Sequence, residues 1–149
     1  MGMWIGLQEG VRESRLAQKD LNISVVGFGY IGASIGLTLA SKGFPVTGID
    51  INESLLEQLS NGECPFEEPG LQDLLDLSKS NGKLALSSQF SPVTDSEVVI
   101  MVVGTPLDDD FNPNLEFVIN ASEQIGTNLS RGTIVMVKST VPPGATIDV

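Results

Sequence analysis

The sequence predicts an α/β fold with a doubly wound parallel sheet, and three observations predict it. Short apolar runs alternate with segments of helical periodicity along the chain. Strands that alternate with helices pair in parallel, because parallel neighbours need a crossover connection between them. A glycine-rich turn joins the first apolar run to the first helical segment. The length of 149 residues suits a single domain, and the right-handed crossover rule favours the strand order 3-2-1-4-5.

Five apolar runs are predicted to form the strands: residues 23–26, 46–50, 84–87, 98–103 and 134–137. Four segments with helical periodicity are predicted helices: residues 31–41, 53–59, 71–77 and 115–129. Asn52 and Asn114 are predicted N-caps, and Gly43 with Pro45 closes the first helix. The unbroken apolar runs 98–103 and 134–137 are typical of strands that are covered on both faces.

The glycine-rich turn has the sequence Gly27-Phe28-Gly29-Tyr30-Ile31-Gly32. Because it follows a predicted strand and opens a helix, G-x-G-x-x-G here indicates a dinucleotide-binding, Rossmann-like fold. Gly27 is expected to permit the tight turn, Gly29 to let a pyrophosphate approach the backbone, and Gly32 to bring the helix close to the sheet. The N–H groups and the positive dipole end at the helix start would then bind the phosphates. The alternative is a turn that serves packing only.

Asp50 ends the second predicted strand, where this fold places a carboxylate that accepts hydrogen bonds from the adenosine ribose. A carboxylate there also repels a 2′-phosphate, and no arginine follows it in Ile51-Asn52-Glu53. The sequence therefore favours NAD over NADP. The alternative is that Asp50 only stabilises a turn or caps a helix.

Two more loops fall at carboxyl ends of predicted strands, where open α/β sheets bind ligands at the reversal of strand order. Gly104-Thr105-Pro106 follows the fourth strand, and we expect it to lie beside the nicotinamide half of the cofactor. Ser139 and Thr140 follow the fifth strand, so their hydroxyl groups are expected to face the same crevice.

Composition excludes several classes of function. The net charge is −11, from 19 acidic and 8 basic residues, so we expect no nucleic-acid and no membrane partner. The chain has no histidine, and its one cysteine, Cys64, cannot form an internal disulfide, which favours a reducing, cytoplasmic setting. Residues 21–41 are uncharged and long enough to span a bilayer as a helix. Their glycines instead favour a strand, a turn and a helix over a membrane-spanning helix. Residues 108–110 are three consecutive aspartates, which we interpret as a solvated loop, so no metal is expected.

A combination of motifs resembles the UDP-glucose/GDP-mannose dehydrogenase family, the nucleotide-sugar dehydrogenases that include UDP-N-acetyl-D-mannosamine dehydrogenases. The resemblance covers roughly residues 21–149 and leaves residues 1–20 as an N-terminal extension. Its segments, in order, are Val26-Gly27-Phe28-Gly29-Tyr30-Ile31-Gly32, Asp50-Ile51-Asn52-Glu53, Glu68-Pro69-Gly70-Leu71, Val103-Gly104-Thr105-Pro106 and Ser139-Thr140-Val141-Pro142-Pro143-Gly144. The last four segments together are far more specific than the glycine turn.

The resemblance implies the cofactor half of an NAD-dependent oxidoreductase. Such enzymes, which serve polysaccharide biosynthesis, oxidise the C6 hydroxyl of a nucleotide sugar to a carboxylate with two NAD⁺. In the family the glycine turn, the acidic residue, the Gly-Thr-Pro loop and the serine matching Ser139 contact NAD, so the cofactor-binding set is Gly27, Phe28, Gly29, Tyr30, Ile31, Gly32, Asp50, Gly104, Thr105, Pro106 and Ser139. The threonine matching Thr140 lies near the reacting centre and helps to hold a water.

Two departures from the family pattern matter. Some members carry a basic residue where this chain has Leu55, so one adenosine contact is missing. The family's nucleophilic cysteine, its sugar-binding domain and its dimerisation helix lie beyond the position that matches Val149. Cys64 does not match the nucleophile's motif. We therefore expect this chain to bind NAD but not to catalyse the reaction alone. The nucleotide sugar would bind through a C-terminal domain that this chain lacks. The full-length protein is expected to be a homo-oligomer.

Three other readings of the sequence stay open at this point. A stand-alone NAD-binding or sensing module would use the same residues without chemistry. A hydroxyacid-type or 6-phosphogluconate dehydrogenase shares the glycine turn and the acidic residue, although residues 68–71 and 139–144 argue against it. A methyltransferase that binds S-adenosylmethionine has no pyrophosphate to explain Gly32.

Overall fold

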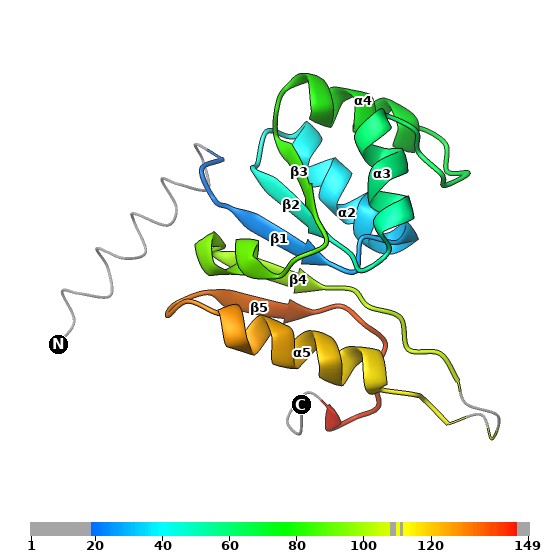
Figure 1. Cartoon of the computed structure of the whole chain (residues 1–149), viewed down its shortest axis with the longest axis vertical. Coiled ribbons are helices and arrows are strands. Elements are labelled where there is room, and N and C mark those ends of the chain that lie inside the picture. The colour runs from blue at the N-terminus through cyan, green and yellow to red at the C-terminus, as the bar shows by residue number, and fades with distance from the viewer. Residues whose placement is uncertain (1–18, 108–109, 111, 146–149) are drawn as a thin grey trace, which may run out of the picture.

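The structure is a computed structural model, and it describes residues 19–107, 110 and 112–145. Its centre is a five-stranded parallel sheet with the strand order β3-β2-β1-β4-β5, as the sequence predicts (Figure 1). The strands are β1 (Ile23–Val26), β2 (Val46–Ile49), β3 (Leu84–Ser87), β4 (Val98–Met101) and β5 (Ile134–Val137).

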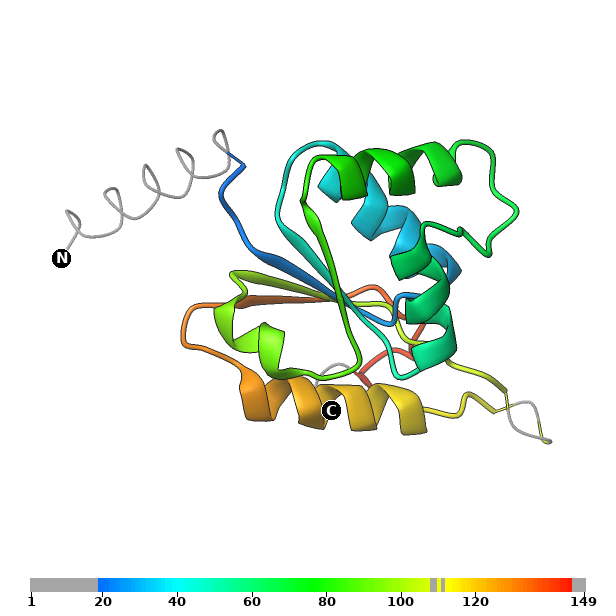
Figure 2. The same cartoon turned by 45° about the horizontal axis from the view of Figure 1, so that its top comes forward.

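Helices cover the sheet on both faces. Helices α2 (Tyr30–Ser41), α3 (Glu53–Asn61) and α4 (Leu71–Ser80) lie on one face, whereas α5 (Glu116–Asn128) and the 3₁₀ turn η1 (Ser91–Asp95) lie on the other (Figure 2). Two apolar clusters result, one under α2 and α4 around Val25 and Leu37, and one under α5 around Val99 and Met101. The two packed faces make this a three-layer α/β domain.

The central strands end at aligned positions, so their carboxyl ends lie at one edge of the sheet. Val26 at the end of β1 is aligned with Ile49 of β2 and with Met101 of β4. Met101 is in turn aligned with Val137 at the end of β5. The loops that follow β1, β2, β4 and β5 therefore start side by side, at the point where the strand order reverses.

Phe28 lies inside the glycine turn, but its side chain belongs to the hydrophobic core. The ring is fully buried. A Cβ on Gly36 of α2 would lie 2.4 Å from Phe28 Cε2, and a Cβ on Gly48 of β2 would lie 2.6 Å from Phe28 Cδ2. Helix and strand can therefore sandwich the ring only because both positions are glycine. Phe28 is one of the expected cofactor contacts; its buried ring packs in the core, so its backbone is the part that can meet a ligand.

Two expectations about the strands differ from the structure. The fifth predicted strand is present as β5, but it is not buried: Ile134, Val135 and Met136 are 49%, 40% and 46% exposed, because β5 is an edge strand of the described sheet. The fourth strand ends at Met101, and Val102 and Val103 continue as a loop. Apolar composition at these positions does not distinguish a strand from a loop, or an edge strand from a central one.

The helix boundaries follow the predictions to within a few residues. Asn52 caps α3, with its side chain accepting a hydrogen bond from the Leu55 N–H. Asn114 does not occupy the N-cap of α5, which is Leu115; its side chain accepts from the Glu116 N–H instead. Among the described residues, no helix is long and apolar enough to cross a membrane.

The packing around Phe28 generates a stability prediction. Gly36→Ala should lower the free energy of unfolding by about 1–3 kcal/mol, because the added methyl group overpacks a close-packed core. The measurement is chemical denaturation followed by circular dichroism. Gly126→Ala in α5 is the matched control: its Cβ would meet open space, so stability should be unchanged or rise by up to about 1 kcal/mol. Equal stability of the two variants would contradict the packing account.

Candidate functional site

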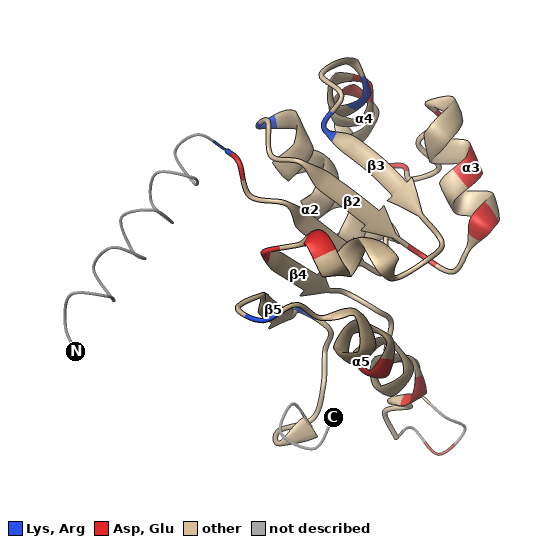
Figure 3. Cartoon of the chain, turned by 60° about the vertical axis from the view of Figure 1, so that its left-hand side comes forward, with Lys and Arg blue, Asp and Glu red and all other residues tan. Residues whose placement is uncertain are grey.

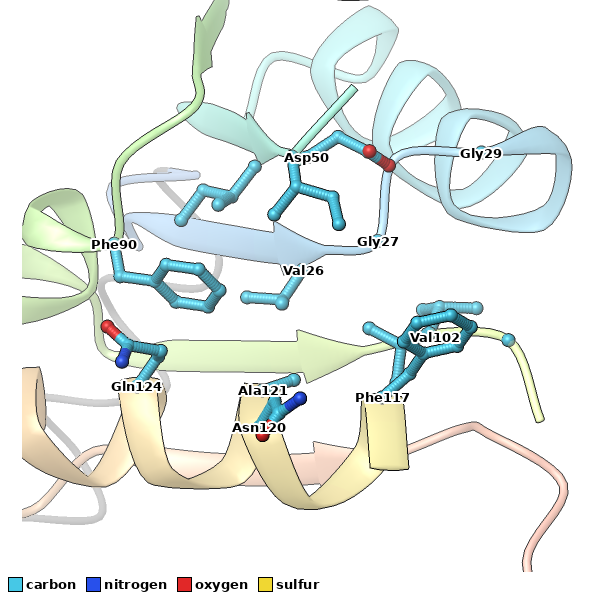
Figure 4. Close-up of a pocket in the computed structure, with 14 residues that line it drawn as sticks. Val26, Gly27, Gly29, Asp50, Phe90, Val102, Phe117, Asn120, Ala121 and Gln124 are labelled. Atoms are coloured by element: carbon cyan, nitrogen blue, oxygen red, sulfur yellow. The ribbon is translucent and has the colours of Figure 1, made fainter. Parts of the chain in front are cut away.

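A cleft of about 470 Å³ opens at the carboxyl edge of the sheet, between the ends of β1, β2 and β4 and one side of α5. Figure 4 shows side chains from these elements converging on it. Its lining residues are Val26, Gly27, Gly29, Ile49, Asp50, Ile51, Phe90, Val102, Val103, Gly104, Phe117, Asn120, Ala121 and Gln124. The cleft therefore gathers Gly27, Gly29, Asp50 and Gly104, four of the residues that the sequence singles out.

The three glycines of the turn have different physical roles. Gly27 has a φ of +87°, and a Cβ there would lie 2.7 Å from the carbonyl oxygen of Val102. A Cβ on Gly32 would lie 1.9 Å from the carbonyl oxygen of Gly27. These two glycines permit close backbone approaches, whereas a Cβ on Gly29 would meet nothing within 4 Å. The space above Gly29 is open and forms part of the cleft.

The start of α2 is left without the usual partners of a helix N-terminus. The Ala33 N–H donates to the Gly29 carbonyl at 2.7 Å, so the N–H groups of Tyr30, Ile31 and Gly32 precede this first turn of the helical ladder. Its N-cap is Gly29, no side chain caps it, and its first turn holds no acidic residue. Helix α3, in contrast, is capped by Asn52 and carries Glu53 in its first turn. An anion at the start of α2 would complete its hydrogen bonding and meet the positive end of the helix dipole.

Asp50 stands at the cleft wall and already holds one hydrogen bond. Its Oδ1 accepts from the Asn52 N–H at 2.9 Å, which shapes the turn into α3. Figure 4 shows its carboxylate directed toward the Gly27–Gly29 segment. The turn-stabilising role considered for Asp50 is therefore present, and it leaves Oδ2 for a ligand hydroxyl on the same side as the phosphate-binding helix.

The loops after β4 and β5 are tied to each other. The Ser139 hydroxyl donates to the carbonyl of Val103 at 2.8 Å, directly before Gly104. The Lys138 N–H donates to the Met101 carbonyl at 2.8 Å. Ser139 is half-buried and Thr140 is exposed, next to the Gly104-Thr105-Pro106 loop but outside the cleft lining. The hydroxyl proton of Ser139 is used within the protein, so this side chain offers its lone pairs to a ligand.

Four residues of the cleft were not anticipated from the sequence. Three of them lie along one side of α5: Phe117, Asn120 and Gln124. Their spacing of three and four residues is visible in the sequence and places them on one face of a helix. Phe90 enters through η1, a short 3₁₀ turn whose sequence carries no comparable signal. Together they give the far wall two aromatic rings and two amide groups (Figure 4).

The charge distribution agrees with binding through the backbone. No Lys or Arg is among the cleft-lining residues. Figure 3 shows basic residues on α4 and beside β5, and acidic residues along α3 and α5. A phosphate in this cleft would thus be held by N–H groups rather than by cationic side chains.

Tyr30, the first residue of α2, turns its side chain away from the cleft. Its hydroxyl donates to the Glu68 carboxylate, and its ring meets Phe66 edge-on, with centroids 6.0 Å apart. Both partners belong to the loop between α3 and α4. The hydrogen bond to Glu68, and next the negative charge of Glu68, raise the pKa of the Tyr30 phenol above its ordinary value of 10.0.

A comparison with protein families adds the decisive observation. Residues 21–149 match the UDP-glucose/GDP-mannose dehydrogenase family, NAD binding domain. The chain belongs to this family. The part of the family that it matches is the NAD-binding domain, so the cofactor predicted from the glycine turn and Asp50 is confirmed as NAD at the level of the family.

Individual relatives agree with the family assignment. The chain is 42% identical over 126 residues to an uncharacterised protein of Methanocaldococcus jannaschii, covering 83% of this chain and 14% of that protein. It is 34% identical over 125 residues to UDP-glucose 6-dehydrogenase YwqF of Bacillus subtilis, covering 83% of this chain and 28% of the relative. A solved structure of UDP-D-ManNAc dehydrogenase from Pyrococcus horikoshii superimposes with a TM-score of 0.82 at 33% identity, covering 86% of this chain and 30% of that one. The chain thus spans less than a third of the length of these relatives.

Cys64 does not line this cleft. Its side chain is half-buried, packs against the core cluster under α2, and donates weakly to the Phe66 carbonyl, so it serves packing. Asp108 and Asp109 lie outside the described residues. Within the described residues, no group of three or more Asp, Glu or Cys side chains is arranged to hold a metal ion.

The Tyr30–Glu68 contact generates a pH prediction. Tyr30 is the only tyrosine of the chain, so the absorbance of its phenolate reports one group. The titration midpoint should lie above 10.0, and Glu68→Gln should bring it back toward that value. Because the folded-state pKa is raised, the contact stabilises the fold fully below the unfolded pKa of about 10 and loses this effect as the pH rises through the folded pKa. A midpoint that is the same in both proteins would contradict the contact.

Proposed function

We propose that this chain is the cofactor half of a nucleotide-sugar 6-dehydrogenase and that it binds one NAD across the carboxyl edge of its sheet. The observation that carries the proposal is the pairing of two features in one cleft. One is the uncapped start of α2 with open space above Gly29. The other is the Asp50 carboxylate directed toward the same turn.

The pyrophosphate would bind the N–H groups at the start of α2. Gly27 and Gly32 close the turn tightly enough to aim this helix end at the cleft, and Gly29 keeps the approach free of side chains. This arrangement suits a cleft without lining cations.

The adenosine half would lie between Asp50 and α5. Asp50 Oδ2 would accept from a ribose hydroxyl while Oδ1 keeps the turn to Asn52. The adenine would occupy the part of the cleft that Phe90, Phe117 and the amides of Asn120 and Gln124 line. Flat apolar surface with a few convergent polar groups is typical of a cofactor pocket.

The nicotinamide half would lie toward Gly104, Thr105, Pro106 and Ser139. Ser139 uses its proton on Val103, so it would accept a hydrogen bond from the carboxamide N–H₂ rather than donate one. Thr140, exposed on the next position, is the residue we assign to supporting a water near the reacting centre.

The reaction that we propose for the complete enzyme is oxidation of a sugar C6 hydroxyl to a carboxylate with two NAD⁺. The second oxidation in this family uses a cysteine thiolate, and a thiolate must lie near the nicotinamide to add to an aldehyde. Cys64 packs beside α4 and does not line the cleft, so it is not placed for this step. A substrate domain that these 149 residues do not contain would bind the sugar and supply the nucleophile. We expect the complete enzyme to be a homo-oligomer.

Calorimetric titration tests the cofactor assignment. NAD⁺ should bind at least about tenfold more tightly than NADP⁺, because the Asp50 carboxylate hydrogen-bonds ribose hydroxyls and repels a 2′-phosphate. Asp50→Asn keeps an acceptor for the Asn52 N–H, and it should weaken NAD⁺ about tenfold while narrowing the preference over NADP⁺. S-adenosylmethionine, which lacks a pyrophosphate, should not bind measurably. Tight binding of S-adenosylmethionine with none of NAD⁺ would refute the proposal.

The phosphate position is tested by a substitution that the fold tolerates. Gly29 has a φ of −66° and open space around its Cβ position, so Gly29→Ala should leave the unfolding midpoint unchanged. The methyl group would stand where the pyrophosphate approaches, and the Kd for NAD⁺ should rise by about tenfold or more. Gly126→Ala, also into open space but outside the cleft lining, should change neither quantity appreciably. Unchanged NAD⁺ affinity in Gly29→Ala would place the phosphates elsewhere.

A further inference from the structure

The segment Glu68-Pro69-Gly70-Leu71 carries much of the family resemblance, and it leads the chain into α4. It does not line the cleft. Its Glu68 carboxylate accepts a hydrogen bond from the hydroxyl of Tyr30, which belongs to the glycine turn. This contact joins two motifs that are 38 residues apart in sequence.

The loop that presents Glu68 is held firmly by its own hydrogen bonds. The Glu68 N–H donates to the Phe66 carbonyl at 2.9 Å, and the Glu68 carbonyl accepts from the Leu71 N–H at 3.1 Å. At the other end of the loop, Gln72 accepts from the Cys64 N–H at 3.0 Å and donates to the Gly62 carbonyl at 2.9 Å. Gly70, with a φ of +84°, turns the chain into α4.

Helix α4 connects this loop to the body of the domain. Leu71 and Leu75 are buried in the same cluster as Leu37 and Ala40 of α2. The Ser78 hydroxyl also contacts the carbonyl of Leu37. Glu68 is therefore fixed relative to the middle of α2, and through Tyr30 it reaches back to the first residue of that helix.

The first turn of α2 needs such support more than an ordinary helix start does. It follows Gly27 and Gly29 and itself contains Gly32, and its N-cap makes no side-chain hydrogen bond. A helix end whose N–H groups have no partner tends to fray. A side-chain cap would suppress fraying, but it would occupy the N–H groups that the ligand needs.

We propose that Glu68 and Tyr30 form a positioning pair that holds the first turn of α2 in the conformation that receives the pyrophosphate of NAD. This inference rests on the proposed position of the phosphates. Neither side chain would touch the cofactor, because Tyr30 extends away from the cleft. The length of the tyrosine side chain keeps the charge of Glu68 away from the start of the helix. The ring contact with Phe66 adds apolar support to the same bridge.

The pair should act on binding much more than on folding. Tyr30 is 50% exposed and Glu68 is exposed, so the contact adds little to global stability. Opening of one helical turn, however, removes the binding-competent state, and the apparent Kd rises as the inverse of the competent fraction that remains.

The test is a double-mutant cycle on NAD⁺ affinity. Tyr30→Phe removes the hydroxyl but keeps the ring on Phe66, and Glu68→Ala removes the acceptor. Each should raise the Kd for NAD⁺ by about five- to tenfold, and the double variant should be no worse than either single one, because both act through one contact. Glu68→Gln, which keeps a neutral acceptor, should recover part of the affinity. Glu67→Ala removes the neighbouring exposed carboxylate and should bind NAD⁺ like the unmodified protein.

Two further measurements separate positioning from general destabilisation. The unfolding midpoint should be the same in all five variants. Amide hydrogen exchange at Tyr30, Ile31 and Gly32 should accelerate in Tyr30→Phe and Glu68→Ala, while exchange in the middle of α2 stays unchanged.

The outcomes distinguish this inference from the proposed function. If Gly29→Ala weakens NAD⁺ binding but Tyr30→Phe and Glu68→Ala bind as the unmodified protein does, the positioning pair is refuted and the cofactor site stands. Additive losses in the double variant, or an equal loss in Glu67→Ala, would also refute it. If the unmodified protein binds no NAD⁺ at millimolar concentration, the proposed function and this inference both fail.

Discussion

The close approach of three backbone segments at the β1–α2 turn is the constraint on which the rest of the site depends. The chain leaves β1 through Gly27, packed against the Val102 carbonyl, and enters α2 with Gly32 packed against the Gly27 carbonyl. Any side chain at these two positions would collide with backbone, which cannot move as the end of a side chain can. The approach aims the N-terminus of α2 at the carboxyl edge of the sheet, and the cleft, the Asp50 wall and the loops after β4 and β5 are arranged around it.

The sequence predicts those parts of the fold that are determined by periodicity and by glycine. The five strands, their order and the turn at Gly27 follow from alternating apolar runs and one motif, and the structure confirms them. The family relation could also be predicted, because five short motifs in a fixed order are far more specific than any one of them.

Other features depend on contacts between distant residues, which no local pattern encodes. Phe28 sits in a binding motif, yet its ring fills the gap between Gly36 and Gly48, so the motif position does not reveal its packing role. The exposure of β5 follows from its place at the sheet edge rather than from its apolar sequence. Phe90 reaches the cleft only because η1 packs beside α5, a helix that begins much later in the chain, at Glu116.

The two helix starts near the cleft show how binding and stability compete for the same N–H groups. Helix α3 is capped by the Asn52 side chain and carries Glu53 in its first turn, where a negative charge suits the helix dipole. Helix α2 has neither, which leaves its N–H groups for a ligand and its first turn without internal support. Support that does not block the ligand must come from the side of the helix, and the Tyr30 side chain is the group that reaches a partner there. A carboxylate is a suitable partner, since a charged acceptor strengthens the hydrogen bond, and the phenol separates its charge from the phosphates. The tyrosine fixes the helix start relative to the acidic loop between α3 and α4, and it keeps the carboxylate of that loop away from the phosphates. The acidic loop and the anion-binding turn can therefore be neighbours in one protein.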